Sequence, residues 1–266
     1  MRKTFIALST LLLSAVTVAE TLTFGVVPQQ SASRLAEQWE PLVAEISRET
    51  GYDIAFSTAP NIPEYEKRLS AGEYDIAYMN PYHYTVYSKQ PGYRAFAKAK
   101  DKKISGILVA RKTNNIESLQ ALQGQRLAFP SPAAFAATVL TQSDLREANV
   151  EFESDYVTSH DSVYLSVARG FYPAGGGVMR TFNSLPDEVK SQLEPIWTTK
   201  PYTPHAIAHH PRMTHDQVKL IQQALKSIDQ TLEGRTSLKL LNINGFESAI
   251  DTDWDDVRAL NIKVLD

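Results

Sequence analysis

The chain has 266 residues, of which 27 are basic and 30 acidic, so its formal net charge at pH 7 is −3. This length allows one large domain or two smaller ones. The lack of excess positive charge argues against a nucleic-acid partner. The lack of cysteine excludes disulfide bonds and a lipid-anchor cysteine.

The first 19 residues are predicted to be a cleaved signal peptide. Arg2 and Lys3 form a positive region, residues 5–18 are mostly apolar, and Thr17-Val18-Ala19 fits a cleavage site. We expect the mature chain to begin near Glu20, with its net charge changed from −3 to −5 because two basic residues are lost. A transmembrane anchor needs a longer apolar run than residues 5–18, and no later segment contains such a run. We therefore expect a soluble periplasmic protein.

Apolar periodicity predicts strands that alternate with helices along the whole chain. Strands are expected at 22–27, 52–57, 74–79, 93–99, 104–110, 126–129, 156–158, 174–179 (or a glycine-rich turn), 195–199 and 203–209. Helices are expected at 35–51, 63–72, 116–122, 131–149, 159–170, 187–193 and 214–233, and another is expected to begin at 81. The first of them is expected to be kinked or broken at Pro41. Residues 245–265 show no clear period. This alternation predicts open, mostly parallel α/β sheets with helices on both faces, in two lobes.

Four strand-to-helix turns are the candidates for ligand binding, because ligands of such folds bind beyond the carboxyl ends of the strands. These turns are residues 29–33, 78–84, 131–137 and 158–161. The first two belong to one series of elements and the last two to the other. If the lobes face each other, all four turns line one cleft that closes about a hinge.

The turn at Thr158-Ser159-His160-Asp161 is the strongest candidate. Ser159 is predicted to be the N-cap of a helix whose unpaired amides and positive dipole end favour an anion. The Ser159 hydroxyl and the His160 imidazole would add donors, and the alternative is a plain helix cap. A Ser-His-Asp triad is not expected, because neighbours on a helix point about 100° apart.

Several other residues have both a functional and a structural interpretation. Tyr78 and Tyr82 would either line a ligand pocket or pack in an aromatic cluster. Arg180 would clamp an anion or lie on the surface, and Asn80 is expected to be a turn former or a helix cap.

No metal or cofactor site is expected. The histidines at 205, 209, 210 and 215 have no nearby cysteine and only Asp216 as an acidic ligand. The aspartates at 251, 253, 255 and 256 lack the glycine and the glutamate of a calcium loop.

With these features in place, the sequence resembles the periplasmic phosphate/phosphite/phosphonate-binding proteins of ABC transporters, which have a type II periplasmic-binding fold. The markers, in chain order, are Phe24-Gly25-Val26-Val27-Pro28, Gly72 to Tyr78 with Asn80-Pro81-Tyr82, Leu119 to Phe129, Ser159-His160-Asp161 followed by Val167-Ala168-Arg169-Gly170, and Asp253 to Arg258. The resemblance implies a discontinuous first lobe of residues 20–107 plus 203–266, and a second lobe of residues 108–202.

The resemblance also implies the site residues. Ser159 and His160, together with the loop after the 126–129 strand, would grip the anion, and Tyr78, Tyr82, Gln29 and Gln30 would complete the site. A hydroxyl-rich run of the family is replaced here by Ser131-Pro132-Ala133-Ala134-Phe135. Only Ser131 keeps a hydroxyl, although the amides at Ala133 and Ala134 can still face an anion.

The function implied is that of a monomeric, non-enzymatic receptor, which binds a small oxyanion and delivers it to an ABC permease in the inner membrane. One alternative is a sensor module of the same fold that acts on a histidine kinase. A hydrolase that uses His160 with Ser131 or Ser159 is a second alternative, although the sequence shows no base with an orienting partner.

Overall fold

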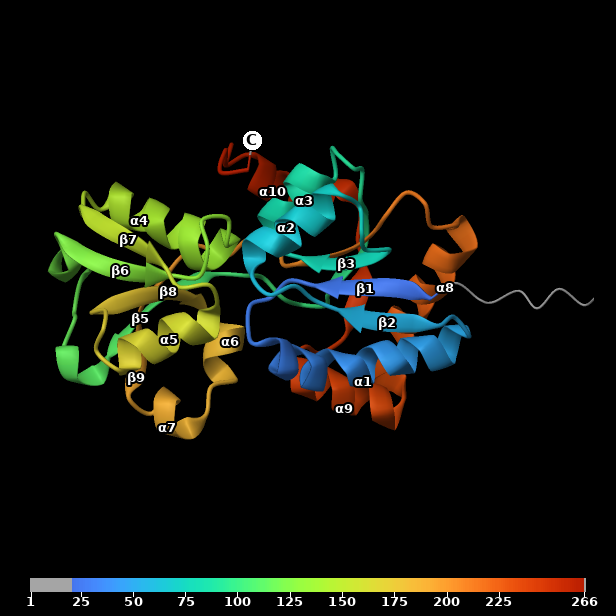
Figure 1. Cartoon of the computed structure of the whole chain (residues 1–266), viewed down its shortest axis with the longest axis horizontal. Coiled ribbons are helices and arrows are strands. Elements are labelled where there is room, and N and C mark those ends of the chain that lie inside the picture. Colours follow the sequence, from blue (N-terminus) through green and yellow to red (C-terminus); the bar gives the residue numbers. More distant parts are fainter. Residues whose placement is uncertain (1–20, 266) are drawn as a thin grey trace, which may run out of the picture.

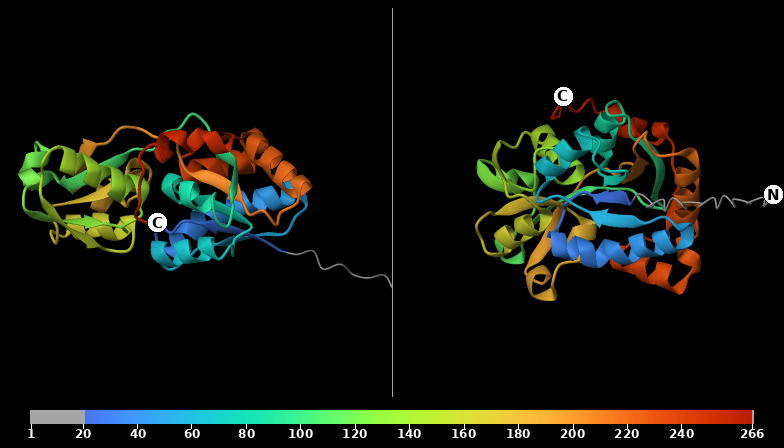
Figure 2. Two further views of the ribbon diagram at one scale, coloured as in Figure 1. Left: turned by 90° about the horizontal axis from the view of Figure 1, so that it is seen from above. Right: turned by 45° about the vertical axis from the view of Figure 1, so that its right-hand side comes forward.

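The computed structural model describes residues 21–265. The predicted signal peptide and its cleavage site lie outside the described residues. Two lobes lie side by side along the longest axis of the molecule, and each contains one sheet with helices on both faces (Figures 1 and 2).

The first sheet has six strands in the order β11-β4-β10-β3-β1-β2. Its strands are β1 (Leu22–Val26), β2 (Ile54–Ser57), β3 (Ile76–Met79), β4 (Arg94–Ala99), β10 (Ala206–His209) and β11 (Phe246–Ser248). The helices of this lobe are α1 (Ala32–Thr50), α2 (Ile62–Ser70), α3 (Pro81–Tyr87), α8 (His215–Ser227), η4 (Ile228–Gln230), α9 (Leu232–Leu241), η5 (Asp251–Trp254) and α10 (Asp255–Arg258).

The second sheet has five strands in the order β7-β6-β8-β5-β9. Its strands are β5 (Gly106–Arg111), β6 (Gln125–Phe129), β7 (Phe152–Tyr156), β8 (Ala174–Val178) and β9 (Leu193–Thr198). The helices of this lobe are η1 (Lys112–Asn114), η2 (Leu119–Leu122), the π-helix η3 (Phe135–Leu140), α4 (Thr141–Glu147), α5 (His160–Ala168), α6 (Met179–Asn183) and α7 (Asp187–Lys190).

Both sheets are mixed, whereas the sequence predicted mostly parallel ones. Strand β1 is parallel to β2 and β3, and β6 is parallel to β7 and β8. Strand β10, which enters from the other lobe, is antiparallel to β3 and β4, and β5 is antiparallel to β8 and β9. The reason is that parallel neighbours need a crossover helix, whereas β5 and β10 follow directly from strands of the opposite lobe.

Two segments, residues 100–105 and 199–205, connect the lobes. They pair with each other midway, because the Ile104 amide donates to the Tyr202 carbonyl at 2.8 Å and the Tyr202 amide donates back at 2.9 Å. Such a short two-stranded connection is the usual place for a hinge. The lobe boundaries at 107/108 and 202/203 stay predictions.

Three sequence-based expectations about helices differ from the structure. Helix α1 is not broken at Pro41, and its buried Trp39 and Leu42 keep it packed against the sheet on both sides of that residue. The helix expected at 131–149 begins only at Phe135. The helix expected at 214–233 ends at Ser227, the last residue of α8, and Thr231 then caps a separate helix, α9.

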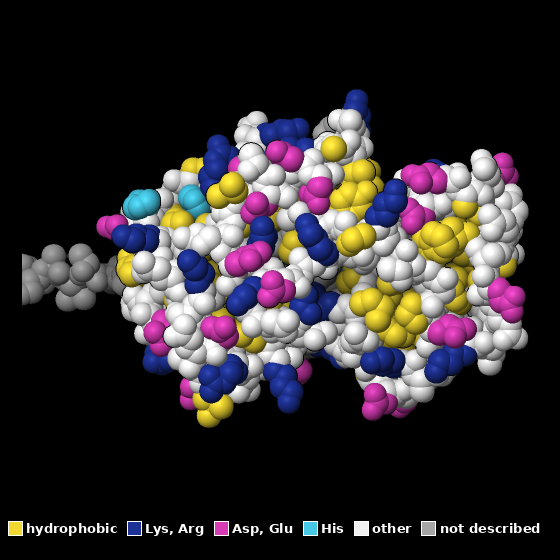
Figure 3. Space-filling model, turned by 180° about the vertical axis from the view of Figure 1, so that it is seen from behind, with side chains coloured by type: hydrophobic (Ala, Val, Ile, Leu, Met, Phe, Trp, Pro, Cys, Tyr) yellow, Lys and Arg dark blue, Asp and Glu magenta, His cyan; other side chains and the backbone are white. Residues whose placement is uncertain are grey.

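Apolar residues from both lobes meet in one core. Ala133 to Ala137 of the second lobe pack in the same buried cluster as the strands of the first. The described part of the chain has no helix with the length and apolar character required to cross a membrane. On the face in Figure 3, Lys and Arg side chains are interspersed with Asp and Glu side chains.

Candidate functional site

The four predicted turns meet between the lobes. The His160 amide, at the start of α5, donates to the Gln29 carbonyl of the first lobe at 2.9 Å. The Asn80 side-chain amide, at the start of α3, donates to the Ala133 carbonyl of the second lobe at 3.0 Å. Each of these two hydrogen bonds joins a turn that follows a strand of one lobe to a turn that follows a strand of the other lobe.

Ser159 caps helix α5, as the sequence predicted. Its Oγ accepts from the Ser162 amide at 3.1 Å, and its backbone is extended. Thr158 just before it is exposed and has a positive φ of 76°, so the chain turns sharply there and places His160 in the first helical turn. His160 is thereby directed into the space between the lobes.

That space is a cavity of about 10 Å³, which is room for about one water molecule. Polar side chains from both lobes line it, namely Gln29, Asn80, His160 and His205. The rest of the lining is Val27, Ile62, Ile104, Ala134, Phe135, Ala136, Ala137 and Val178. A polyatomic anion needs more room, so the lobes have to separate to admit one.

The start of the π-helix η3 lines this cavity. Amides in a first helical turn have no acceptor within the helix, and Phe135, Ala136 and Ala137 occupy that turn. Two glycines allow the helix to approach so closely. A Cβ at Gly106 would overlap the Ala136 carbonyl oxygen, and one at Gly176 would overlap that of Ala137.

Both histidines of the cavity are neutral at pH 7. Burial, followed by the nearby positive charge of Arg180, lowers the pKa of His160 to about 3. The same two causes hold the pKa of His205 well below its usual value. The imidazole of His160 is fixed by a contact of 3.2 Å between its Nδ1 and the Thr181 hydroxyl. Neutral imidazoles act here as hydrogen-bonding groups and not as fixed charges.

Acid is therefore expected to destabilise the folded protein through His160. An unfolded histidine has a pKa of about 6.5, so between about pH 6.5 and 3 the unfolded state binds more protons. The free energy of unfolding decreases as the pH falls through this range, by about 2 kcal/mol at pH 5 for His160 alone. Urea unfolding at pH 7.5 and pH 5 measures this loss.

A variant comparison separates this effect from general acid destabilisation. In His160→Gln the difference between the two pH values should be smaller by about 2 kcal/mol. His215→Gln, at an exposed position at the start of α8, is the control and should keep the full difference. Equal pH dependence in the two variants would contradict the assignment.

Gln29 and Gln30 hold the lobes together. Arg180 donates to Gln29 Oε1, and Gln29 Nε2 lies 3.3 Å from His205 Nε2. Gln30 Nε2 donates to the Ser184 hydroxyl of the second lobe at 3.1 Å. Arg180 is only partly buried, so it reaches the cleft from the edge of α6 and is not a plain surface residue.

The structure separates Tyr78 from Tyr82. Tyr78 stacks on His205, with ring centroids 4.8 Å apart and planes 12° from parallel. Tyr82 does not line the interlobe cavity in this structure, so its contact with a ligand stays a prediction. Its hydroxyl accepts from the Leu265 amide at 2.7 Å, because α3 turns this side chain toward the C-terminal segment.

Ser131 and Ala133 lie beside the cavity and do not line it. The Ser131 hydroxyl is buried and has no hydrogen-bond partner in residues 21–265. The Ala133 carbonyl is already bound by Asn80. A small shift of this turn would be needed to bring the Ser131 hydroxyl to a ligand, so its role in binding stays a prediction.

Sequence reasoning missed two residues of the cavity. Asn80 is the predicted helix cap, because its Oδ1 accepts from the His83 amide at 2.8 Å, but its Nδ2 also reaches across the lobes. Its position directly after a buried strand was a signal for that role. His205 is considered in the sequence only as a metal ligand, and no local pattern indicates its contact with Tyr78.

Comparison with known proteins identifies the family. The model of the ABC transporter, phosphonate, periplasmic substrate-binding protein family matches residues 24–254. The chain belongs to this family. A curated relative in Mycolicibacterium smegmatis, the phosphate-import protein PhnD, is 23% identical over 210 residues. That match covers 67% of the chain and spans 62% of the relative's length.

Two solved structures of phosphonate-binding proteins share the fold. The binding-protein component of an ABC phosphonate transporter from Pseudomonas aeruginosa has a TM-score of 0.83 and 18% identity, over 91% of this chain and 85% of that one. PhnD1 from Prochlorococcus marinus in complex with methylphosphonate has a TM-score of 0.82 and 19% identity, over 91% and 98%. The two-lobed type II periplasmic-binding fold is therefore confirmed.

A phosphonate-binding-protein family is a family of non-enzymatic receptors, and the geometry of this member does not favour a hydrolase. The Ser159 hydroxyl contacts Ser162. The ring of His160 contacts Thr181 and neither Ser131 nor Ser159. Between residues 21 and 265, no group of three or more His, Cys, Asp or Glu side chains is placed to hold a metal ion.

Proposed function

We propose that the protein is the periplasmic receptor of an ABC transporter and binds a small oxyanion of the phosphonate, phosphite or phosphate class in the interlobe cavity. The observation that supports this most is the convergence of the four turns, joined by His160 to Gln29 and by Asn80 to Ala133. The ligand would pass from the periplasm to a permease in the inner membrane.

The proposed mechanism is hinge closure. The lobes open about residues 100–105 and 199–205, and the anion enters between the amides of η3 and the side chains of Gln29, Asn80 and His160. Closure then buries the anion, which is favourable only where enough donors replace its lost water. Selection among oxyanions follows from the number of donors that meet each oxygen atom.

Screening by thermal shift and calorimetry tests the proposal. We expect at least one of phosphate, phosphite and methylphosphonate to raise the melting temperature and to bind with micromolar or tighter affinity, while sulfate, thiosulfate and arsenate serve as comparison anions. A ligand at 100 times its Kd adds about 2.7 kcal/mol to the stability of the folded state. If none of the six anions stabilises the protein, the proposal is wrong.

A further inference from the structure

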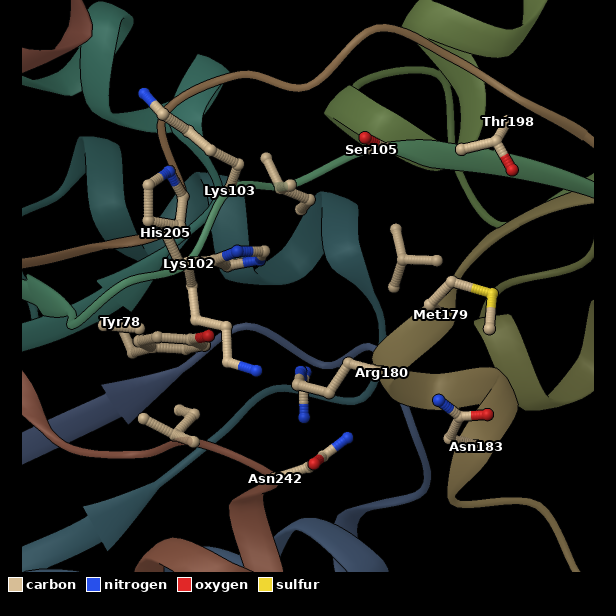
Figure 4. A pocket seen from close by; sticks show the side chains of 15 residues that line it. Tyr78, Lys102, Lys103, Ser105, Met179, Arg180, Asn183, Thr198, His205 and Asn242 are labelled. Carbon is tan, nitrogen blue, oxygen red and sulfur yellow. The ribbon is translucent and has the colours of Figure 1, made fainter.

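A second and larger cavity, of about 370 Å³, adjoins the first beside the hinge segments (Figure 4). Both lobes contribute to it, with Asn242 from the first and Asn183 from the second. The two cavities share His205, Ile104 and Val178 in their linings. A group held in the smaller cavity thus has a neighbouring space into which a substituent can extend.

The charged side chains that line the larger cavity are all basic. Its lining includes Lys102, Lys103 and Arg180, and none of the described residues that line it is acidic. In Figure 4 the Lys102 amine and the Arg180 guanidinium extend into the same space, beside the Tyr78 hydroxyl. Two cations that face each other without a carboxylate repel, although the whole chain has a net charge of −3. A bound anion would relieve this repulsion.

Lys103 is in a different position from Lys102. Its Nζ lies 3.4 Å from the Thr203 hydroxyl, and Figure 4 shows its amine extending away from Arg180. The Lys102 amine is therefore the lysine group that faces Arg180 across the cavity. Asn183 and Asn242 approach the same space with side-chain amides, which add uncharged donors.

Gln29 lines the smaller cavity and contacts two residues that line the larger one. It accepts from Arg180 through Oε1 and contacts His205 through Nε2. Arg180 lines only the larger cavity, yet it is bonded to a residue of the smaller one. A ligand that spans both spaces would pass this contact and place its far end between Lys102 and Arg180.

We propose that the ligand has two acidic groups: an oxyanion held in the smaller cavity and a second negative group, such as a carboxylate, held by Lys102 and Arg180. This inference rests on the proposed function and specifies the class of its ligand. A substituent with an amine would meet two cations and no carboxylate. A neutral alkyl substituent would make no charged contact with either cation.

Three phosphonates of similar length test the proposal by calorimetry: propylphosphonate, 2-aminoethylphosphonate and 3-phosphonopropionate. We expect 3-phosphonopropionate to bind at least about tenfold more tightly than propylphosphonate, and 2-aminoethylphosphonate to bind most weakly. The preference should decrease as salt is raised, because the second contact is between charges at a cavity open to solvent.

Variants of Lys102 locate the second group. Lys102→Met should reduce the preference to about threefold or less, and Lys102→Glu should reverse it in favour of 2-aminoethylphosphonate. Lys219→Met, which makes the same change at an exposed position on α8, is the matched control and should keep the full preference. Methylphosphonate lacks the substituent, so Lys102→Met should change its affinity by less than about twofold.

The outcomes separate the two proposals. Binding of methylphosphonate or propylphosphonate without a preference for 3-phosphonopropionate would overturn the inference and leave the proposed function standing. A preference that survives in Lys102→Met and Lys102→Glu would also overturn it, because the second group would then lie elsewhere. Failure of every phosphonate and of phosphate and phosphite to bind would overturn both.

Discussion

Replacing Gln29 with glutamate is expected to lower the affinity for a small oxyanion by about 100-fold. The new carboxylate would stand at the edge of the interlobe cavity, bonded to Arg180 as the Gln29 amide oxygen is now. Two negative charges about 4–5 Å apart at the effective dielectric constant of a protein site repel by roughly 3–4 kcal/mol. The carboxylate of the variant therefore repels an anion that binds in the cavity.

Folding should be nearly unaffected by this change. Glutamate has the shape of glutamine, gains an ion pair with Arg180, and can accept from His205 if that ring presents its Nε2 proton. We expect the melting temperature without ligand to stay within about 2 °C of the parent, so that calorimetry of the variant reports binding alone.

The control for Gln29→Glu is the same substitution at Gln142. That residue is also buried, and its Oε1 accepts from an arginine, Arg146, at 3.0 Å. It lies on α4 and does not line the interlobe cavity. Gln142→Glu should bind oxyanions like the parent. If both variants bind alike, Gln29 does not face the ligand.

Replacing Gly176 with alanine should produce the largest loss of stability, at least about 3 kcal/mol. A Cβ at this position would overlap the Ala137 carbonyl oxygen and lie 2.8 Å from Phe129 Cδ1. The first contact is with backbone of η3, which cannot move aside as a side chain can. For a chain of this size the melting temperature should decrease by about 6–12 °C.

Gly51→Ala distinguishes this packing effect from a general intolerance of alanine. Gly51 ends α1 with a φ of 74°, and a Cβ there would have no heavy atom within 4 Å. Alanine at this position is expected to lower the free energy of unfolding by only about 1 kcal/mol, which is the cost of the left-handed backbone conformation. Equal shifts of the two melting temperatures would show that η3 does not need the close contact with β8.

The loss at Gly176 should also extend to binding. The glycine allows η3 to lie directly on the sheet, and Phe135 to Ala137, whose amides have no acceptor within η3, line the cavity. Outward displacement of this helix would move those donors away from the turn at His160. The glycine-rich strand β8 is therefore a place of close backbone approach.

Some helix ends were predictable from local sequence and others were not. Ser159 and Asn80 cap their helices with their own side chains, a pattern visible within four residues. The break after α8 depends on distant residues. Thr231 caps α9 and also donates to Glu45 of α1 at 2.8 Å, so packing against α1 interrupts what looked like one amphipathic helix.

The amino-acid sequence by itself determined the alternation of strands and helices, the two-lobed fold class, and the four turns at which a ligand site had to be sought. These depend on periodicity and capping, which act over a few residues. Only the tertiary structure decided which side chains enter the cleft, because those contacts join distant parts of the chain. Gln29 meets His205 from 176 positions away, and Tyr82, two positions after the cleft residue Asn80, is turned toward Leu265 instead.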